Sequence, residues 1–280
     1  ATRSCAPAAF TPGRYESYTP AAVPLVMGIV NVTPDSFSDG GKFLEPASAI
    51  AHGLSLVEEG ASILDIGGES TRPGAVPVDA ETELARVIPV LEGLSGRCRL
   101  SIDTRHADVA RAAVAAGATL INDVSASLWP VAAELGVGWI AMHMQGEPGT
   151  MQTNPHYDDV VSEVCAFLRE RATAASEAGV KEIWVDPGFG FGKTDAHNLA
   201  LLAHLDRVVE LGWPVMVGTS RKAMLGRLLA ASDGSTDIVP ADDRLAGSIA
   251  TEVWAMHAGA SMIRAHDVRS AIQAAKVVAA

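Results

Sequence analysis

Three polar side chains, each at the end of a short apolar run, could bind a flat heterocycle. Asp103, Asn122 and Asp186 offer carboxylate and amide oxygens that accept hydrogen bonds. Two parallel N–H bonds to a carboxylate fix a planar ring in its plane and in its orientation. A ring that carries amidine-like N–H donors is therefore the ligand that these residue types favour.

A second group of residues at similar positions could bind a phosphorylated group. Arg72, Lys222, Arg264 and His266 are cations or potential cations in an otherwise acidic chain. Arginine adds a two-pronged fork that matches phosphate geometry. Asn31 supplies a neutral oxygen, which is compatible with Mg²⁺ held mainly by substrate phosphates and water.

The pattern of apolar runs predicts the elements that must position these residues. We expect eight strands, each followed by a helical pattern, which is typical of a closed parallel (β/α)8 barrel of the TIM type. In such a barrel the carboxyl ends of all strands meet at one mouth. A doubly wound open sheet is the alternative. The expected strands are 25–32, 62–67, 99–103, 119–124, 138–143, 183–186, 214–218 and 261–265, and the expected helices are 46–60, 79–95, 107–116, 130–136, 158–179, 196–211, 222–230 with 242–258, and 267–279.

We expect one domain over residues 25–280, preceded by a short irregular extension over 1–24. Polar loops at 33–45 and 68–78 are interpreted as mobile covers over the mouth. Four histidines on helical patterns are interpreted as surface or packing residues, and Trp139, Trp184 and Trp254 as core or helix-packing residues. These histidines are His52, His106, His197 and His204. His143 ends the fifth run, and we assign it no catalytic role.

Composition excludes several classes of function. The net charge of −12 argues against a nucleic-acid surface. No segment has the roughly 20 apolar residues of a membrane span, and residues 1–24 lack a secretory apolar core. Three cysteines in no metal-binding spacing suit reduced thiols in the cytoplasm.

Two glycine-rich motifs resemble known signatures but fail at one position each. Residues 188–194 (GFGFGKT) are not a Walker A loop, because Pro187 stands where its first glycine belongs, and Lys193 breaks the dinucleotide pattern. Residues 218–222 (GTSRK) lack the last glycine of a nucleophile elbow. The sequence therefore supports neither a redox cofactor nor a serine nucleophile.

Eight segments, in order, resemble those of the dihydropteroate synthase family, and the resemblance covers residues 25–280. The segments are NVTPDSFSDGG (31–41), GGESTRPG (67–74), SIDT (101–104), ND (122–123), MHMQG (142–146), DPGFGFGK (186–193), SRK (220–222) and RAHDV (264–268). The resemblance implies an enzyme that joins a dihydropterin pyrophosphate to p-aminobenzoate, uses Mg²⁺, is the target of sulfonamides and forms a homodimer.

Roles follow from the resemblance for individual positions. Asp103, Asn122, Asp186 and Lys222 would hold the pterin, while Asn31, Arg264 and His266 would bind the pyrophosphate and its Mg²⁺. Thr71 and Arg72 would organise the substrates. Apart from the resemblance, Asp35 lies on the loop expected to cover the mouth, so it should serve turnover more than pterin binding. Phe37, Phe191 and Ser220 would shape the p-aminobenzoate site. Ala223 departs from the serine that some family members have there, so the p-aminobenzoate carboxylate would bind Ser220 or the backbone N–H groups of the next helix.

The same residues suit a dissociative displacement, in which charge builds on the departing pyrophosphate while a delocalised pterin cation forms. Two other functions remain open at this point. One is a pterin-dependent methyltransferase, which shares a similar barrel and a D-P-G segment. The other is a non-catalytic paralogue that keeps the barrel for binding a partner.

Overall fold

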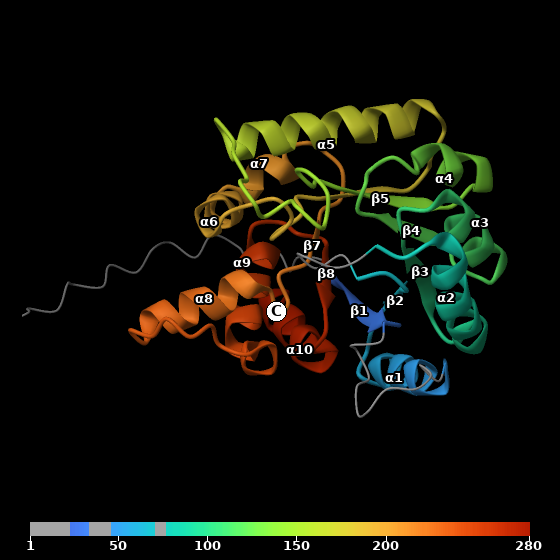
Figure 1. The fold of residues 1–280 in the computed structure, drawn as a ribbon, viewed down its shortest axis with the longest axis horizontal. Coiled ribbons are helices and arrows are strands. Elements are labelled where there is room, and N and C mark those ends of the chain that lie inside the picture. Colours follow the sequence, from blue (N-terminus) through green and yellow to red (C-terminus); the bar gives the residue numbers. More distant parts are fainter. Residues whose placement is uncertain (1–22, 34–45, 71–76) are drawn as a thin grey trace, which may run out of the picture.

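The computed structural model describes residues 23–33, 46–70 and 77–280. In this part of the chain, eight parallel strands form one sheet in the order β6-β5-β4-β3-β2-β1-β8-β7 (Figure 1). The strands are β1 (Leu25–Asn31), β2 (Ile63–Gly67), β3 (Arg99–Asp103), β4 (Leu120–Asp123), β5 (Gly138–Met142), β6 (Ile183–Asp186), β7 (Met216–Val217) and β8 (Met262–Ala265).

Helices follow the strands along the chain and lie outside the sheet (Figure 1). They are α1 (Pro46–Glu58), α2 (Ala80–Leu94), α3 (Ala107–Ala115), α4 (Trp129–Leu135), α5 (Val160–Glu177), α6 (Asp195–Ala203), α7 (Leu205–Val209), α8 (Ala223–Ser232), the short 3-10 helix η1 (Ala241–Asp243), α9 (Leu245–His257) and α10 (Val268–Val278). No helix within the described ranges is both long and apolar enough to span a bilayer.

The two outer strands of the sheet meet and close the barrel. The backbone N–H of Val185 on β6 donates to the carbonyl of Pro214 at 3.0 Å, and Val185 forms a parallel bridge with Val215 just before β7. A doubly wound sheet would leave these edges apart, so the predicted barrel is confirmed. The pairing between these two strands involves few residues, because β7 has two residues where the sequence predicts five.

Alternation along the strands places apolar side chains deep in the barrel and polar ones at its mouth. A buried cluster of seven residues fills the interior: Met27, Ile63, Leu120, Ile140, Trp184, Met216 and Met262. Side chains two residues apart on a strand face the same way. Residues two positions further along these strands therefore also face the interior, nearer the mouth, and four of them are polar: Asp65, Asn122, Asp186 and Arg264.

One helical prediction needs correction. The segment predicted as one helix over 196–211 is two helices, because the backbone at His204 (φ −118°, ψ 32°) leaves the helical conformation. Trp254 on α9 is a helix-packing residue and not a core residue: its indole N–H donates to the Leu202 carbonyl on α6 at 3.1 Å, while 57% of the residue is exposed.

Candidate active site

A pocket opens among the strand ends at the mouth of the barrel, and six of the predicted site residues line it. The lining residues are Asp103, Asn122, Val124, Met142, Asp186, Phe189, Phe191, Gly218, Lys222 and Arg264. The six that the sequence singles out, from four strands and two loops, are Asp103, Asn122, Asp186, Phe191, Lys222 and Arg264. The structure therefore brings the predicted heterocycle acceptors and the predicted phosphate-binding cations into one cavity.

Arg264 lies at the centre of a charged network across the barrel. Its Nε donates to Asp65 Oδ2 at 2.7 Å, and its Nη2 donates to Asp103 Oδ2 at 2.8 Å. The Asn122 amide also donates to Asp65 Oδ2, at 2.8 Å. Asp65, which sequence reasoning missed, is completely buried in the middle of β2. It therefore orients two residues that line the pocket.

Burial and charge both alter the ionisation of this network. Burial raises the pKa of Asp103 to about 7, in spite of Arg264, and the negative charge of Asp65 adds to the effect. Burial also opposes the charge of Arg264, but the carboxylates of Asp65 and Asp103 outweigh it and raise the pKa of the guanidinium. Within the described residues, Oδ1 of Asp103 and Oδ1 of Asn122 have no hydrogen-bond partner. Both oxygens are buried acceptors that a ligand's N–H groups could satisfy.

Asp186 and Lys222 also line the pocket. Asp186, only 5% exposed, accepts from the backbone N–H of Gly188 at 2.8 Å. Burial raises its pKa, although that hydrogen bond and the nearby charge of Lys222 oppose the effect. The Lys222 ammonium lies 4.1 Å from the centre of the Phe191 ring, in cation–π contact. A cation, an aromatic face and a carboxylate thus border the same space.

The loop that follows β6 is held by a buried lysine. Lys193, 1% exposed, contacts Nδ1 of His143 at 2.9 Å and donates to the carbonyls of Gly188 (2.9 Å) and Phe191 (3.0 Å). Burial lowers the pKa of Lys193 to about 7 and that of His143 to about 3. Gly188 has φ +67°, and a Cβ there would lie 1.9 Å from the His143 carbonyl oxygen. The glycine lets the loop pack against the end of β5, which presents Phe191 to the pocket.

A turn held by several polar contacts joins β7 to α8 and carries Ser220. The Ser220 hydroxyl accepts from the His266 backbone N–H and contacts Nδ1 of its ring, both at 3.1 Å. Arg221, with φ +56°, donates through Nε and Nη2 to Asp267 at 2.9 and 2.5 Å. Burial, with Arg264 and Arg221 nearby, lowers the pKa of His266 to about 3. This lowered pKa favours the neutral form of His266, which the sequence treats as a potential cation.

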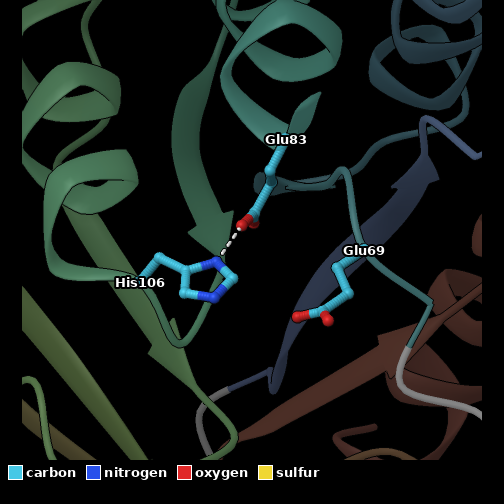
Figure 2. Close-up of side chains that lie close together, drawn as sticks. All are labelled: Glu69, Glu83 and His106. Carbon is cyan, nitrogen blue, oxygen red and sulfur yellow. Dashed lines mark hydrogen bonds and ion pairs between the residues drawn. The ribbon is translucent and has the colours of Figure 1, made fainter. Parts of the chain in front are cut away.

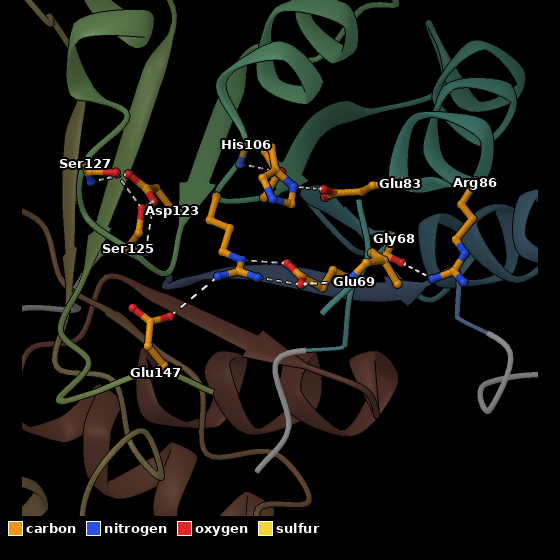
Figure 3. Close-up of polar contacts among 12 residues, drawn as sticks. Gly68, Glu69, Glu83, Arg86, His106, Asp123, Ser125, Ser127 and Glu147 are labelled. Atoms are coloured by element: carbon orange, nitrogen blue, oxygen red, sulfur yellow. Dashed lines mark hydrogen bonds and ion pairs between the residues drawn. The ribbon is translucent and has the colours of Figure 1, made fainter. Parts of the chain in front are cut away.

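Polar contacts also hold the residues that flank 71–76 (Figure 3). Arg86 donates to the Gly68 carbonyl at 2.7 Å. Arg105 donates to both carboxylate oxygens of Glu69, each at 2.9 Å. Oε1 of Glu69 also accepts from the Val78 backbone N–H at 3.3 Å. Glu69 precedes this segment and Val78 follows it, so the contact between them keeps the two flanks close together.

Comparison with known proteins identifies the family. A family description of pterin binding enzymes matches residues 27–266. The dihydropteroate synthase of Mycobacterium leprae is 46% identical over 265 residues, which cover 91% of this chain and 92% of that protein. The chain belongs to the dihydropteroate synthase family.

Solved structures of dihydropteroate synthases agree with this assignment. The Yersinia pestis enzyme in a sulfonamide drug complex has a TM-score of 0.84 at 44% identity and covers 91% of this chain and 93% of its own. The Xanthomonas albilineans enzyme in complex with 7,8-dihydropteroate has a TM-score of 0.79 at 48% identity, with coverage of 91% and 92%. The barrel that the sequence predicts is thus the barrel of the dihydropteroate synthases.

The remaining predicted residues divide into two sets. Asn31 ends β1, where it is half-buried and paired in register with Gly67 on β2, so it lies at the mouth beside the pocket. Four others, expected to act in a dihydropteroate synthase, lie outside the described residues: Asp35, Phe37, Thr71 and Arg72. The sequence did not reveal the contacts that Lys193 and Asp65 make at the site. A lone carboxylate within the apolar run 62–67 was the available signal for Asp65.

Proposed function

We propose that this chain catalyses the condensation of 6-hydroxymethyl-7,8-dihydropterin pyrophosphate with p-aminobenzoate, which yields 7,8-dihydropteroate and pyrophosphate for folate biosynthesis. The C–O bond to pyrophosphate breaks, a C–N bond to the aniline nitrogen forms, and that nitrogen loses a proton. The observation that carries the proposal is the pocket itself, where buried acceptor oxygens of Asp103 and Asn122 lie beside the cations Arg264 and Lys222.

The acceptor oxygens suit the pterin. Asp103 and Asn122 each present one buried oxygen without a partner in the described ranges, and Asp186 adds a third acceptor. A pterin carries ring and exocyclic N–H groups on one edge, so it can satisfy several acceptors in one plane. The carboxylates of Asp103 and Asp186 also favour positive charge on the pterin as its bond to pyrophosphate breaks.

The cations suit the leaving group. Arg264 and Lys222 line the pocket, and His266 lies next to Ser220 at its edge. The cations stabilise charge as it builds on the departing pyrophosphate, while neutral His266 offers one ring N–H to an oxygen. Arg72 would add a cation to this set and Thr71 would help organise the substrates, a proposal that rests on the family resemblance. Asp35 would act through the loop 33–45, which we propose as a cover over the mouth.

Mg²⁺ fits the donor chemistry of the mouth. Asn31 offers a neutral amide oxygen at the end of β1, and an ion whose other ligands are phosphate oxygens and water needs few from the protein. Bound there, Mg²⁺ would neutralise part of the pyrophosphate charge.

Ala223 offers no hydroxyl to the p-aminobenzoate carboxylate, so another donor must bind it. The start of α8 suits this role. Lys222 caps this helix without a side-chain capping bond, and Ser220 lies two residues earlier. Backbone N–H groups at a helix N-terminus favour anions. With Phe37 and Phe191 against the ring, this is where sulfonamides would compete with p-aminobenzoate.

We further propose a homodimer in the cytoplasm. Exposed apolar side chains lie on three neighbouring helices, of which α9 contacts both α6 and α8: Leu199 on α6, Leu228 on α8, and Leu245 and Trp254 on α9. A second copy of the chain could cover this face by two-fold symmetry. Cys98 and Cys165 are both free thiols, which suits a reducing compartment.

One assay tests the proposed reaction. The purified chain is mixed with the dihydropterin pyrophosphate, p-aminobenzoate and Mg²⁺, and 7,8-dihydropteroate is measured by chromatography. We expect product from the unmodified chain and a loss of at least about 100-fold in kcat/KM for Lys222→Met, because an electrostatic contact to the leaving group is removed. A folded protein that gives no product would leave two alternatives: a methyltransferase, which predicts pterin binding without dihydropteroate, and a non-catalytic paralogue that keeps the barrel for binding a partner.

A further inference from the structure

Glu69, Glu83 and His106 converge on one point beside the barrel mouth (Figure 2). They come from the loop after β2, the first turn of α2 and the residue that precedes α3. One potential ligand atom from each, two carboxylate oxygens and a ring nitrogen, lies within 4.8 Å of the other two. Three donors from segments distant in sequence thus meet without any contribution from the pterin pocket.

The Glu83 carboxylate is only partly satisfied. Its side chain is completely buried, and Oε2 contacts Nδ1 of His106 at 2.7 Å. Oε1 is buried and has no hydrogen-bond partner among the described residues. The Thr104 hydroxyl accepts from the His106 backbone N–H at 3.1 Å, and burial raises the pKa of Glu83 although hydrogen bonds from His106 and Thr104 oppose that effect. Because a buried carboxylate oxygen without a partner is costly, the arrangement favours a cation that both oxygens can approach.

We propose that Glu69, Glu83 and His106 form a binding site for a divalent transition metal of the Zn²⁺ class. One imidazole nitrogen and two carboxylate oxygens are a ligand set that Zn²⁺ accepts, with water in the fourth position. Donors around tetrahedral Zn²⁺, each about 2.1 Å from the ion, lie about 3.4 Å apart. The Glu83–His106 contact must therefore open slightly and Glu69 must move closer. Imidazole distinguishes this site from the oxygen ligands that suit Mg²⁺.

The charges around the cluster allow that movement. Glu69 holds Arg105 in its two-bond contact, but Nη1 of Arg105 also lies 3.6 Å from the highly exposed Glu147 (Figure 3). Arg105 therefore has a second carboxylate to which it can turn when Glu69 binds the metal. His106 takes the tautomer that carries its proton on the nitrogen away from the ion. Because 29% of the His106 side chain is exposed, the site is open to solvent on one side.

Zn²⁺ titration of the metal-stripped full chain by calorimetry tests the proposal. We expect one equivalent to bind the unmodified chain, and His106→Asn to weaken its Kd by at least the 10- to 100-fold that loss of an outer-shell partner costs. His156→Gln is the matched control, because it removes a largely exposed histidine that also lies near a carboxylate, Asp158 at 3.7 Å, and it should leave Kd unchanged. Circular dichroism verifies that each variant is folded.

Glu83→Gln is the second variant, because it keeps the shape of the buried side chain while it removes the charge. It should weaken Zn²⁺ binding at least as much as His106→Asn does. Anomalous scattering from Zn²⁺-soaked crystals should place the ion on these three side chains. No binding by the unmodified chain, an equal Kd in His106→Asn, or an ion found elsewhere would overturn the proposal. Dihydropteroate formation is measured separately, so failure of this site leaves the proposed reaction intact.

Discussion

Asp65→Asn should change the pH at which the pterin pocket becomes competent. The substitution keeps the size of the side chain but removes a negative charge that contacts Arg264 and Asn122. The charge of Asp65 contributes to the raised pKa of Asp103, so its loss lets Asp103 ionise at lower pH. Ionised Asp103 is the form that accepts two N–H groups. We therefore expect pterin binding by the variant to persist to lower pH than binding by the unmodified chain.

The size of the change follows from the geometry. Asp65 and Asp103 contact neighbouring nitrogens of the same guanidinium, at 2.7 and 2.8 Å. Their charges are therefore about 5 Å apart and interact by about 3 kcal/mol at an effective dielectric constant of about 20. That energy corresponds to a change of roughly 100-fold in the ionisation equilibrium of Asp103. Turnover should fall at every pH by about 10- to 100-fold, because Arg264 loses a charge-assisted hydrogen bond of about 1.5–3 kcal/mol.

Calorimetric titration with a pterin that lacks the pyrophosphate, from about pH 4 to 9, measures the first effect. In the unmodified chain, binding should weaken as pH falls through about 7, where Asp103 becomes protonated. In Asp65→Asn the same weakening should begin about two pH units lower. Asp123→Asn is the control, since Asp123 is equally buried but its carboxylate accepts from the backbone N–H groups of Ser127 and Leu128 outside the pocket. An unchanged pH profile in Asp65→Asn would refute this account of the network.

Three further variants test other parts of the structure. Burial raises the pKa of Glu252 to about 8, so the folded chain binds a proton that the unfolded chain releases above about pH 4.5. The free energy of unfolding therefore falls as pH rises from about 4.5 to about 8, by up to about 1.4 kcal/mol per pH unit. Glu252→Gln should raise the thermal stability more at pH 8 than at pH 5. A gain that does not depend on pH would contradict this. Gly188→Ala should lower the free energy of unfolding in urea by about 3 kcal/mol or more, because the new Cβ would clash with the His143 carbonyl. Gly149→Ala is the control and should change stability little, because a Cβ there would lie in open space. Trp254→Asp should convert dimers to monomers in light scattering, and a variant that stays dimeric would place the interface elsewhere.

The repeating strand–helix pattern predicted the barrel because each strand is an apolar run that a following amphipathic helix must cover. Short elements were predicted less well. The run at 214–218 gives only Met216–Val217 as a strand, since Pro214 cannot donate to a neighbouring strand and the barrel closes there through a single bridge. The break at His204 has no proline or glycine to mark it, so periodicity alone continued the helix.

The site was predictable to the extent that position along a strand determines where a side chain points. Asp103, Asn122 and Asp186 lie at strand ends, and the parallel barrel brings such ends together whatever the exact register. The partners of these residues depend on register and on side-chain reach across the barrel. Arg264 and Asp65 are 199 residues apart in sequence, and nothing local to either indicates their contact.

Asp65 shows how position within a strand could have been used further. It stands two residues before Gly67, the last residue of β2, and so faces the same side as the strand end. An ionised carboxylate in the barrel interior is stable only with a cation and hydrogen-bond donors around it. The interior faces of the other strands offer Arg264 as the cation nearest the mouth. A buried acid one step below the strand end therefore implies a paired cation at the mouth, and that cation is the one proposed to receive the pyrophosphate charge.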